Sequence, residues 1–259
     1  MTTYLDRILD RHRQMAASDT RSLDSLIAQA RAMPATRGFA AALRWGTELH
    51  VIAEIKRRSP SKGGLRTDLD PAQMAGQYQA GGASCLSVLT DAEHFGGSAE
   101  DLRAARGACS LPVLRKDFTV CAHDVCDARL MGADCVLLIA AALDRSELVE
   151  LHALARSVGL DVLVEIHDEV ELDVALAAGA DVIGVNQRDL VTFEVDHHRA
   201  VRMAAAIADD VVKVAESGVR DRDDAASLHA AGYHAILVGE TLVTANDPSR
   251  AIRELRGID

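Results

Sequence analysis

Short apolar runs alternate with longer segments of helical spacing along most of this chain, starting near residue 49. The runs are rich in Val, Ile and Leu and lack strict apolar–polar alternation, which is typical of strands covered on both faces. They predict strands at 49–55, 84–89, 112–116, 134–140, 161–166, 181–186, 211–216 and 234–239. The segments between them predict helices at 71–80, 98–106, 122–131, 144–157, 168–178, 196–207, 221–231 and 248–256. This alternation predicts parallel strands joined by right-handed crossovers.

Glycines recur at the expected helix ends with a regular spacing. Gly82, Gly107, Gly132 and Gly159 are separated by 25, 25 and 27 residues, which is the length of one strand–loop–helix unit. Four strings nearly repeat one another, as a βα array would: AGGAS (80–84), MGADC (131–135), AGADV (178–182) and AGYHA (231–235). Eight such units close into a barrel without leaving hydrophobic sheet edges. We therefore predict an α/β fold, a (βα)8 TIM barrel, with residues 1–259 in a single domain.

Residues 1–46 precede the first predicted strand and carry apolar residues at helical spacing. They predict a helical N-terminal extension of the barrel. Phe39, Leu43 and Trp45 are expected to pack on the barrel. One hypothesis is that the extension covers the barrel mouth.

Charge and apolar content limit the possible functions. A formal net charge of −11 argues against a nucleic-acid or anionic-membrane surface, because both require a positive patch. The longest apolar run, 135–143, is far shorter than the roughly 20 residues of a membrane span. The charged N-terminus lacks a signal-peptide core, so we expect a cytoplasmic protein. A local basic cluster suits a small anionic substrate: Lys56, Arg57, Arg58, Lys62 and Arg66.

The cysteines give no sign of a metal site or of disulfides. The five cysteines include no CxxC pair, so reduced thiols are expected. The spacing of Cys121, His123 and Cys126 matches no common zinc pattern, and we expect no metal there.

Charged or amide side chains stand at the ends of several predicted strands, where strand stability does not need them. An unpaired buried charge is costly, so strand ends that share this feature indicate one common ligand. In a βα barrel the loops after the strands gather at one face, where active sites lie. The side chains expected at this mouth are Glu54, Lys56, Lys116, Glu165, Asn186, Arg188 and Glu216. Opposite charges nearby are expected to keep these groups ionised, whereas burial is expected to draw the pKa values of Lys and Glu toward neutrality, which suits general acid–base catalysis.

Two glycine pairs predict a phosphate site at the same mouth. Ser217 and Gly218 follow the seventh predicted strand, and Gly239 and Glu240 follow the eighth, before a short helical stretch at 241–245. Loops seven and eight with a helix N-terminus form the usual phosphate site of such barrels, because glycine lets backbone N–H groups approach the oxygens. Glu240 is expected to contribute only through its amide, with its carboxylate turned away.

Six strings in this sequence resemble the indole-3-glycerol phosphate synthase family. They are AEIKRRSPSKG (53–63), LRKDF (114–118), VEIH (164–167), GVNQRDL (184–190), AESGV (215–219) and LVGETL (237–242). The resemblance runs in order from Leu5 to about Gly257, and SPSKG after EIK, together with KDF, is its specific part. Gln187 departs from the family, which often has a second Asn there, and we expect little effect from it.

The resemblance implies a barrel enzyme that closes an indole ring. The implied substrate is 1-(2-carboxyphenylamino)-1-deoxyribulose 5-phosphate, and the implied products are indole-3-glycerol phosphate, carbon dioxide and water. It also implies general acid–base catalysis without a cofactor, by a decarboxylating carbon–carbon lyase of tryptophan biosynthesis.

The resemblance also implies a role for each residue at the mouth. Lys116 is the expected general acid, and Glu165 is the expected base of the dehydration. Lys56, oriented by Glu54, is expected to contact the substrate anion and to serve as a second acid. The remaining expectations are hydroxyl binding by Asn186 and Glu216, support from Arg188, phosphate binding by Ser217, Gly218, Gly239 and Glu240, and an anthranilate pocket lined by Ser59 and Phe118.

Two alternatives stay open from the residues alone. One is another phosphate-binding barrel enzyme, such as an aldolase that forms a Schiff base on Lys116 or Lys56. The other is a non-catalytic scaffold, because barrels host unrelated functions. Contact with other tryptophan-pathway enzymes is equally open. We further expect His167 to be a packed loop residue, and a second hypothesis makes 57–68 a mobile lid.

Overall fold

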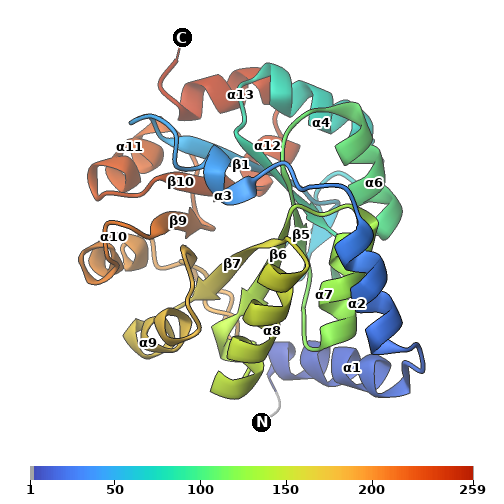
Figure 1. Ribbon diagram of the computed structural model, residues 1–259. Coiled ribbons are helices and arrows are strands. Elements are labelled where there is room, and N and C mark those ends of the chain that lie inside the picture. Colours follow the sequence, from blue (N-terminus) through green and yellow to red (C-terminus); the bar gives the residue numbers. More distant parts are fainter. Residues whose placement is uncertain (1–2, 259) are drawn as a thin grey trace.

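Eight parallel strands form a closed barrel in the computed structural model, which describes residues 3–258 (Figure 1). The strand order around the barrel is β1-β10-β9-β8-β7-β6-β5-β4. Their bounds are β1 His50–Ile55, β4 Cys85–Leu89, β5 Val113–Lys116, β6 Cys135–Ile139, β7 Asp161–Ile166, β8 Val182–Asn186, β9 Val212–Glu216 and β10 Ala235–Val238. The predicted fold class is confirmed, and each predicted strand agrees to within one residue at either end.

Helices follow the strands and cover the outside of the barrel (Figure 1). They are α4 Pro71–Ala80, α6 Ala99–Ala108, α7 Ala122–Met131, α8 Arg145–Ser157, α9 Glu169–Ala177, α10 Arg199–Met203, α11 Arg222–Ala230 and α13 Pro248–Leu255. Asp144, Asp168 and Asp221 each accept backbone N–H groups at a helix start, which satisfies donors that the first turn leaves unpaired. No helix in residues 3–258 is both long and apolar enough to cross a membrane.

Alternation along the strands divides the buried apolar residues into two cores. In β1, Ile52 belongs to the barrel interior, whereas Val51 and Ala53 contact the surrounding helices. The interior is filled mainly by Ile52, Cys85, Leu114, Cys135, Leu137, Leu163, Val182, Val212, Val214, Ala235 and Leu237. Polar residues that continue these inward rows, such as Glu54, are thereby directed into the carboxyl end of the barrel.

The N-terminal extension forms three helices that reach both ends of the barrel. They are α1 Tyr4–Ser18, α2 Leu23–Ala32 and α3 Phe39–Ala42, and α2 lies along α7 (Figure 1). α3 closes the amino end, where Phe39 and Leu43 are buried against interior residues. There the Ala40 N–H donates to Asp161, at the start of β7, over 2.9 Å. The expectation for Trp45 is wrong: its side chain is 79% exposed, because the chain turns outward after Leu43.

α1 lies at the opposite end, beside the loops that follow the strands. Nε2 of His12 lies 3.3 Å from Oδ2 of Asp91, in the loop after β4. The ring of Tyr4 contacts that of Phe193, in the loop after β8, with 5.3 Å between the centroids. Of the three extension helices, α1 therefore borders the mouth and α3 closes the other end.

Some local elements differ from the predicted ones. The segment after β1 contains a short antiparallel hairpin, β2 Arg58–Ser59 with β3 Gly63–Gly64, and α5 Ala92–Phe95 follows β4. The helix predicted at 196–207 begins later, because the carboxylate of Asp196 accepts the His198 N–H and forms a turn before α10. It also ends in a 3-10 turn, η2 Ala204–Ala206.

Candidate active site

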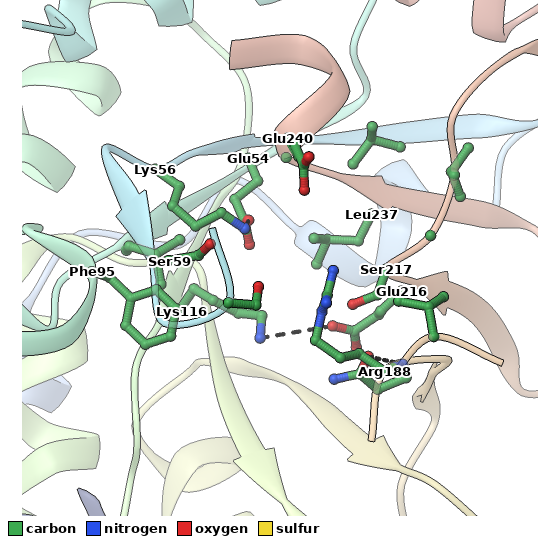
Figure 2. Close-up of a pocket in the computed structure, with 18 of the residues that line it drawn as sticks. Glu54, Lys56, Ser59, Phe95, Lys116, Arg188, Glu216, Ser217, Leu237 and Glu240 are labelled. Carbon is green, nitrogen blue, oxygen red and sulfur yellow. Dashed lines mark hydrogen bonds and ion pairs between the residues drawn. The ribbon is translucent and has the colours of Figure 1, made fainter. Parts of the chain in front are cut away.

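A cavity of about 690 Å³ opens at the carboxyl ends of the strands. Figure 2 shows side chains entering it from different sides, with Lys56 and Ser59 facing Arg188 and Ser217. The structure brings together every residue that the sequence placed at the mouth: Glu54, Lys56, Ser59, Lys116, Phe118, Glu165, Asn186, Arg188, Glu216, Ser217, Gly218, Gly239 and Glu240. Segments far apart in the sequence meet here because all barrel strands end at the same face.

Lys116 is at the centre of the charged groups in the cavity (Figure 2). Its Nζ donates to Oε2 of Glu165 over 3.1 Å and lies 3.8 Å from Oε2 of Glu216. The three residues come from β5, β7 and β9, alternate strands whose inward side chains share one layer. Glu165 and Glu216 are 1% and 2% exposed, so the cluster lies in a low-dielectric environment.

This cluster sets the protonation states of its members. Burial disfavours the charged form of Lys116, but the carboxylates of Glu165, Glu216 and Glu54 outweigh it and raise the pKa of the ammonium. Burial also opposes ionisation of Glu165, yet the charges of Lys116 and His167 lower the pKa of its carboxyl. Burial and the charge of Glu165 raise the pKa of Glu216 to about 8. Of the two expected influences on the pKa, opposite charge therefore prevails over burial at Lys116 and Glu165, and burial prevails at Glu216.

A second ion pair, Lys56 with Glu54, lies beside the first (Figure 2). Nζ of Lys56 donates to Oε1 of Glu54, whose side chain is buried. A Cβ at Gly239 would overlap this same oxygen, so β10 can approach Glu54 only with glycine at that position. The pair therefore supplies the cavity with a second ammonium, fixed by a buried carboxylate.

Asn186 and Arg188 continue β8 into the cavity wall. Nδ2 of Asn186 donates to Oε1 of Glu165 over 2.9 Å, and Oδ1 of Asn186 accepts the Arg188 N–H over 3.0 Å. The guanidinium of Arg188 donates to the backbone oxygen of Phe193, within its own loop, over 3.0 Å. Asn186 thus fixes one oxygen of Glu165 and the start of the following loop together.

The loop after β9 makes a strained turn at the cavity wall. Ser217 has φ 65° and Gly218 has φ 77°, and a non-glycine residue in this region marks backbone strain. A Cβ at Gly218 would lie 2.6 Å from Cγ1 of Val195, so this position requires glycine. Nε2 of Gln187 donates to the carbonyl of Ser217 over 2.8 Å and stabilises the turn. Gln187, the residue that departs from the pattern described in the sequence analysis, therefore stabilises the turn at Ser217.

A short helix, α12 Glu240–Val243, begins directly after Gly239 and completes the wall. The hydroxyl of Thr241 donates to the carbonyl of Val219 over 2.8 Å, which joins α12 to the loop after β9. The carboxylate of Glu240 lies 3.5 Å from Nζ of Lys62, in the turn between β2 and β3. Lys62 therefore offsets the negative charge that would otherwise oppose an anion beside α12.

The basic cluster after β1 is only partly directed at the cavity. Nη2 of Arg57 donates to Asp101 on α6 over 3.1 Å, and Nη2 of Arg58 donates to the carbonyl of Ala92 over 2.9 Å. Of the five cations, Lys56 and Lys62 line the cavity. The expectation that the whole cluster serves an anionic substrate is therefore wrong, because the arginines attach the hairpin segment to neighbouring elements.

The aromatic part of the wall was largely missed. Phe95, Phe118 and Phe193 are three of the four phenylalanines in the chain, and all three line the cavity. The rings of Phe95 and Phe118 are 6.3 Å apart. Only 3% of the residues are aromatic, so a phenylalanine that follows a predicted strand is a usable signal for the cavity wall. Only Phe118 was predicted at the wall from the sequence.

One group in residues 3–258 has donor atoms close enough to hold a metal: His12, Asp91 and Asp117. However, Arg11 lies 3.7 Å from Oδ2 of Asp91, and Arg115 donates to Oδ2 of Asp117 over 3.0 Å. These cations already compensate the carboxylates. The group is therefore better suited to attach α1 to the loops after β4 and β5 than to bind a metal.

Solved structures share the fold of this chain at low sequence identity. A 3-hexulose-6-phosphate synthase matches with a TM-score of 0.61 and 17% identity, over 82% of this chain and 100% of that one. A thiamine phosphate pyrophosphorylase from Pyrococcus furiosus matches with a TM-score of 0.60 and 16% identity, over 82% of this chain and 95% of that one. At such identities the likeness shows the barrel fold alone.

Sequence comparison gives a more specific result. The chain is 53% identical over 228 residues to indole-3-glycerol phosphate synthase 2 of Streptomyces coelicolor, covering 88% of each chain. It is 52% identical over 209 residues to indole-3-glycerol phosphate synthase of a Nocardioides species, covering 81% of this chain and 80% of the relative. The family model for indole-3-glycerol phosphate synthase matches residues 5–255. This chain therefore belongs to the indole-3-glycerol phosphate synthase family.

Proposed function

We propose that this chain closes the indole ring of indole-3-glycerol phosphate in the cavity at the carboxyl end of its barrel. The substrate is 1-(2-carboxyphenylamino)-1-deoxyribulose 5-phosphate, a small phosphorylated anion, and carbon dioxide and water are the other products. The observation that carries the proposal is the position of Lys116, an ammonium held in the cavity between the carboxyl groups of Glu165 and Glu216.

Lys116 is the proposed general acid of ring closure. An aromatic carbon of the substrate attacks the ketone carbon, and negative charge develops on the ketone oxygen. The ammonium polarises this oxygen and transfers a proton to it as the carbon–carbon bond forms. The raised pKa of Lys116 keeps the proton available before the step. Loss of carbon dioxide then returns the bonding electrons to the ring, so the step needs no separate electron acceptor.

Glu165 is the proposed base of the dehydration. Despite its burial, its carboxyl is held ionised by Lys116 and can accept a proton from the ring-closed intermediate. The hydroxyl group takes a proton from a lysine and leaves as water. Lys56, fixed by Glu54, is the proposed second acid, because its ammonium lines the same cavity.

The other wall residues are proposed to bind the substrate. The glycines after β9 and β10 line the cavity, and their backbone N–H groups are the proposed phosphate donors. Phe95 lies beside Phe118 as one side of an aromatic pocket. Asn186 and Glu216 are proposed to contact the hydroxyl groups of the substrate, with Arg188 as support. The phosphate is proposed to contact Ser217, Gly218, Gly239 and Glu240, and the anthranilate ring is proposed to contact Ser59 and Phe118.

The two alternative functions are less well supported. A Schiff-base aldolase needs a neutral lysine as nucleophile, whereas the surroundings of Lys116 raise the pKa of its ammonium. A scaffold without activity would gain nothing from the buried charges of the cavity, which cost stability. We further propose that the chain acts in the cytoplasm, in keeping with five free thiols.

Indole fluorescence that develops from the anilino-deoxyribulose phosphate with purified protein tests the proposal. Lys116→Met and Glu165→Gln are each expected to lower kcat at least about a hundredfold, the scale of a lost general acid or base. Lys213→Met is the matched control, because Lys213 is a buried lysine on β9 that pairs with Asp209 outside the cavity. Absence of fluorescence with wild-type protein would contradict the function, and full turnover in either site variant would contradict the assignment.

A further inference from the structure

His167 lies directly behind Glu165, after the end of β7. It follows Leu163 and Glu165 in the row of side chains that β7 directs toward the barrel interior. Its side chain is 12% exposed, yet it does not belong to the wall of the cavity. His167 therefore reaches Glu165 without occupying any space that a substrate would use.

Glu171, in the first turn of α9, fixes the imidazole ring of His167. Oε2 of Glu171 accepts the backbone N–H of His167 over 2.7 Å and lies 3.0 Å from Nδ1 of the ring. An ionised carboxylate only accepts hydrogen bonds, so Nδ1 carries a hydrogen. The other ring nitrogen, Nε2, is buried without a hydrogen-bond partner among the described residues. It lies 3.7 Å from Oε1 of Glu165.

The two glutamates favour a charged ring. A neutral ring with its hydrogen on Nδ1 would turn the lone pair of Nε2 toward the carboxylate of Glu165, whereas a protonated ring turns an N–H toward it. Burial opposes the charge, as does Arg199 on α10. The contacts with Glu171 and Glu165 outweigh both and raise the pKa of His167.

The carboxylate of Glu165 has different neighbours on its two oxygens. Oε1 accepts from Asn186 over 2.9 Å and faces His167, while Oε2 accepts from Lys116 over 3.1 Å. We propose that His167 is a positioning residue for Glu165: held by Glu171, its imidazolium keeps Oε1 in place so that Oε2 faces Lys116 and the substrate. This inference rests on the proposed role of Glu165 as the base.

The positive charge of His167 beside Glu165 affects the pH dependence of kcat/KM. Activity is lost at low pH when Glu165 takes up a proton and no longer acts as a base. Removal of the positive charge of His167 raises the pKa of Glu165, so the acid limb of kcat/KM moves to higher pH. An opposite charge at this distance changes a carboxyl pKa by about 1–3 units, and we expect a shift of about one unit. Lys116 and Glu216, the other titratable neighbours of Glu165, are unchanged in the variant.

The test is a comparison of pH profiles for His167→Ala and wild-type protein. We expect kcat at the optimum to fall about tenfold, with little change in KM, together with the upward shift of the acid limb. Glu171→Gln retains the His167 ring but removes the charge that favours protonation of this ring. The acid limb should therefore move to higher pH, but by less than in His167→Ala. His152→Ala is the matched control, because His152 on α8 is also buried with an unpartnered Nε2 and lies outside the cavity wall.

The outcomes separate the inference from the proposed function. An unmoved acid limb in both variants, whether or not kcat falls, would mean that His167 only supports the fold and would overturn the inference. If His167→Ala does not fold, as judged by its melting curve, the profile of Glu171→Gln decides. Wild-type protein that gives no turnover would instead contradict the function itself.

Discussion

At the amino end of the barrel the carboxylate of Asp134 is fully buried, and at the carboxyl end that of Glu216 is buried to nearly the same degree. Their partners differ. Asp134 accepts the backbone N–H groups of Arg37 and Val113, each over 2.8 Å, and a third hydrogen bond from Arg106. One oxygen of Glu216 has no hydrogen-bond partner in residues 3–258, and the other lies 3.8 Å from Lys116.

The difference separates a carboxylate that stabilises the fold from one that is available for chemistry. Both oxygens of Asp134 accept hydrogen bonds, so its charge is compensated at the end of the barrel that α3 covers. Glu216 is left incompletely paired, and its surroundings favour the protonated form. Burial alone therefore does not distinguish the two ends of this barrel, whereas the completeness of pairing does.

The largest effect on stability is expected at the amino end. Asp134→Ala leaves the N–H groups of Arg37 and Val113 and the guanidinium of Arg106 without their acceptor, so the free energy of unfolding should fall by about 3–5 kcal/mol. Urea unfolding measures this loss. The folded fraction should retain kcat within about twofold of wild type, because no reacting group is altered. An Asp134→Ala protein of normal stability but low kcat would reverse the comparison.

A smaller effect, and one on activity, is expected at the mouth. A Cβ at Gly184 would overlap Oε1 of Glu216, so Gly184→Ala must displace that side chain from Lys116. We expect kcat to fall by about 10- to 100-fold, since misplacement on the order of 1 Å is this costly. Gly107→Ala is the matched control: nothing lies within 4 Å of its added Cβ, and Gly107 is within α6. It should keep full kcat, and equal losses in both variants would argue against the geometry.

The last expected effect is the pH dependence of stability caused by Glu216. Its folded pKa is raised from 4.5 to about 8, so its contribution to stability is complete below pH 4.5 and is lost as the pH rises to about 8. Glu216→Gln is neutral at every pH and lacks this loss. The Tm of the variant relative to wild type should therefore increase between pH 5 and pH 9, by about 2–4 °C for each kcal/mol. A Tm difference that stays constant across this range would mean that Glu216 is already ionised at pH 5.

Much of the fold was predictable because barrel strands are covered on both faces and are therefore continuous apolar runs. The predicted strands and the cavity residues at their ends agree with the structure for this reason. Predictions failed in two situations. In one, a side chain pairs with a residue that is remote in sequence, and in the other, a side chain stabilises a turn in place of a helix. Arg57 pairs with Asp101, and Asp196 forms the turn that delays α10. Neither partner is marked by the local pattern.

The sequence by itself determined the eight βα units, the family and the charged residues at the strand ends, because strand periodicity and the strand ends are local properties. Only the tertiary structure decided how these residues are paired and charged. Lys116, Glu165 and Glu216 are on three different strands, and their opposite pKa directions depend on distances and burial that exist only after the barrel closes. The same holds for His167, whose place behind Glu165 depends on a contact with Glu171. Electrostatic energies depend on separation and dielectric environment, and neither is a property of the sequence alone.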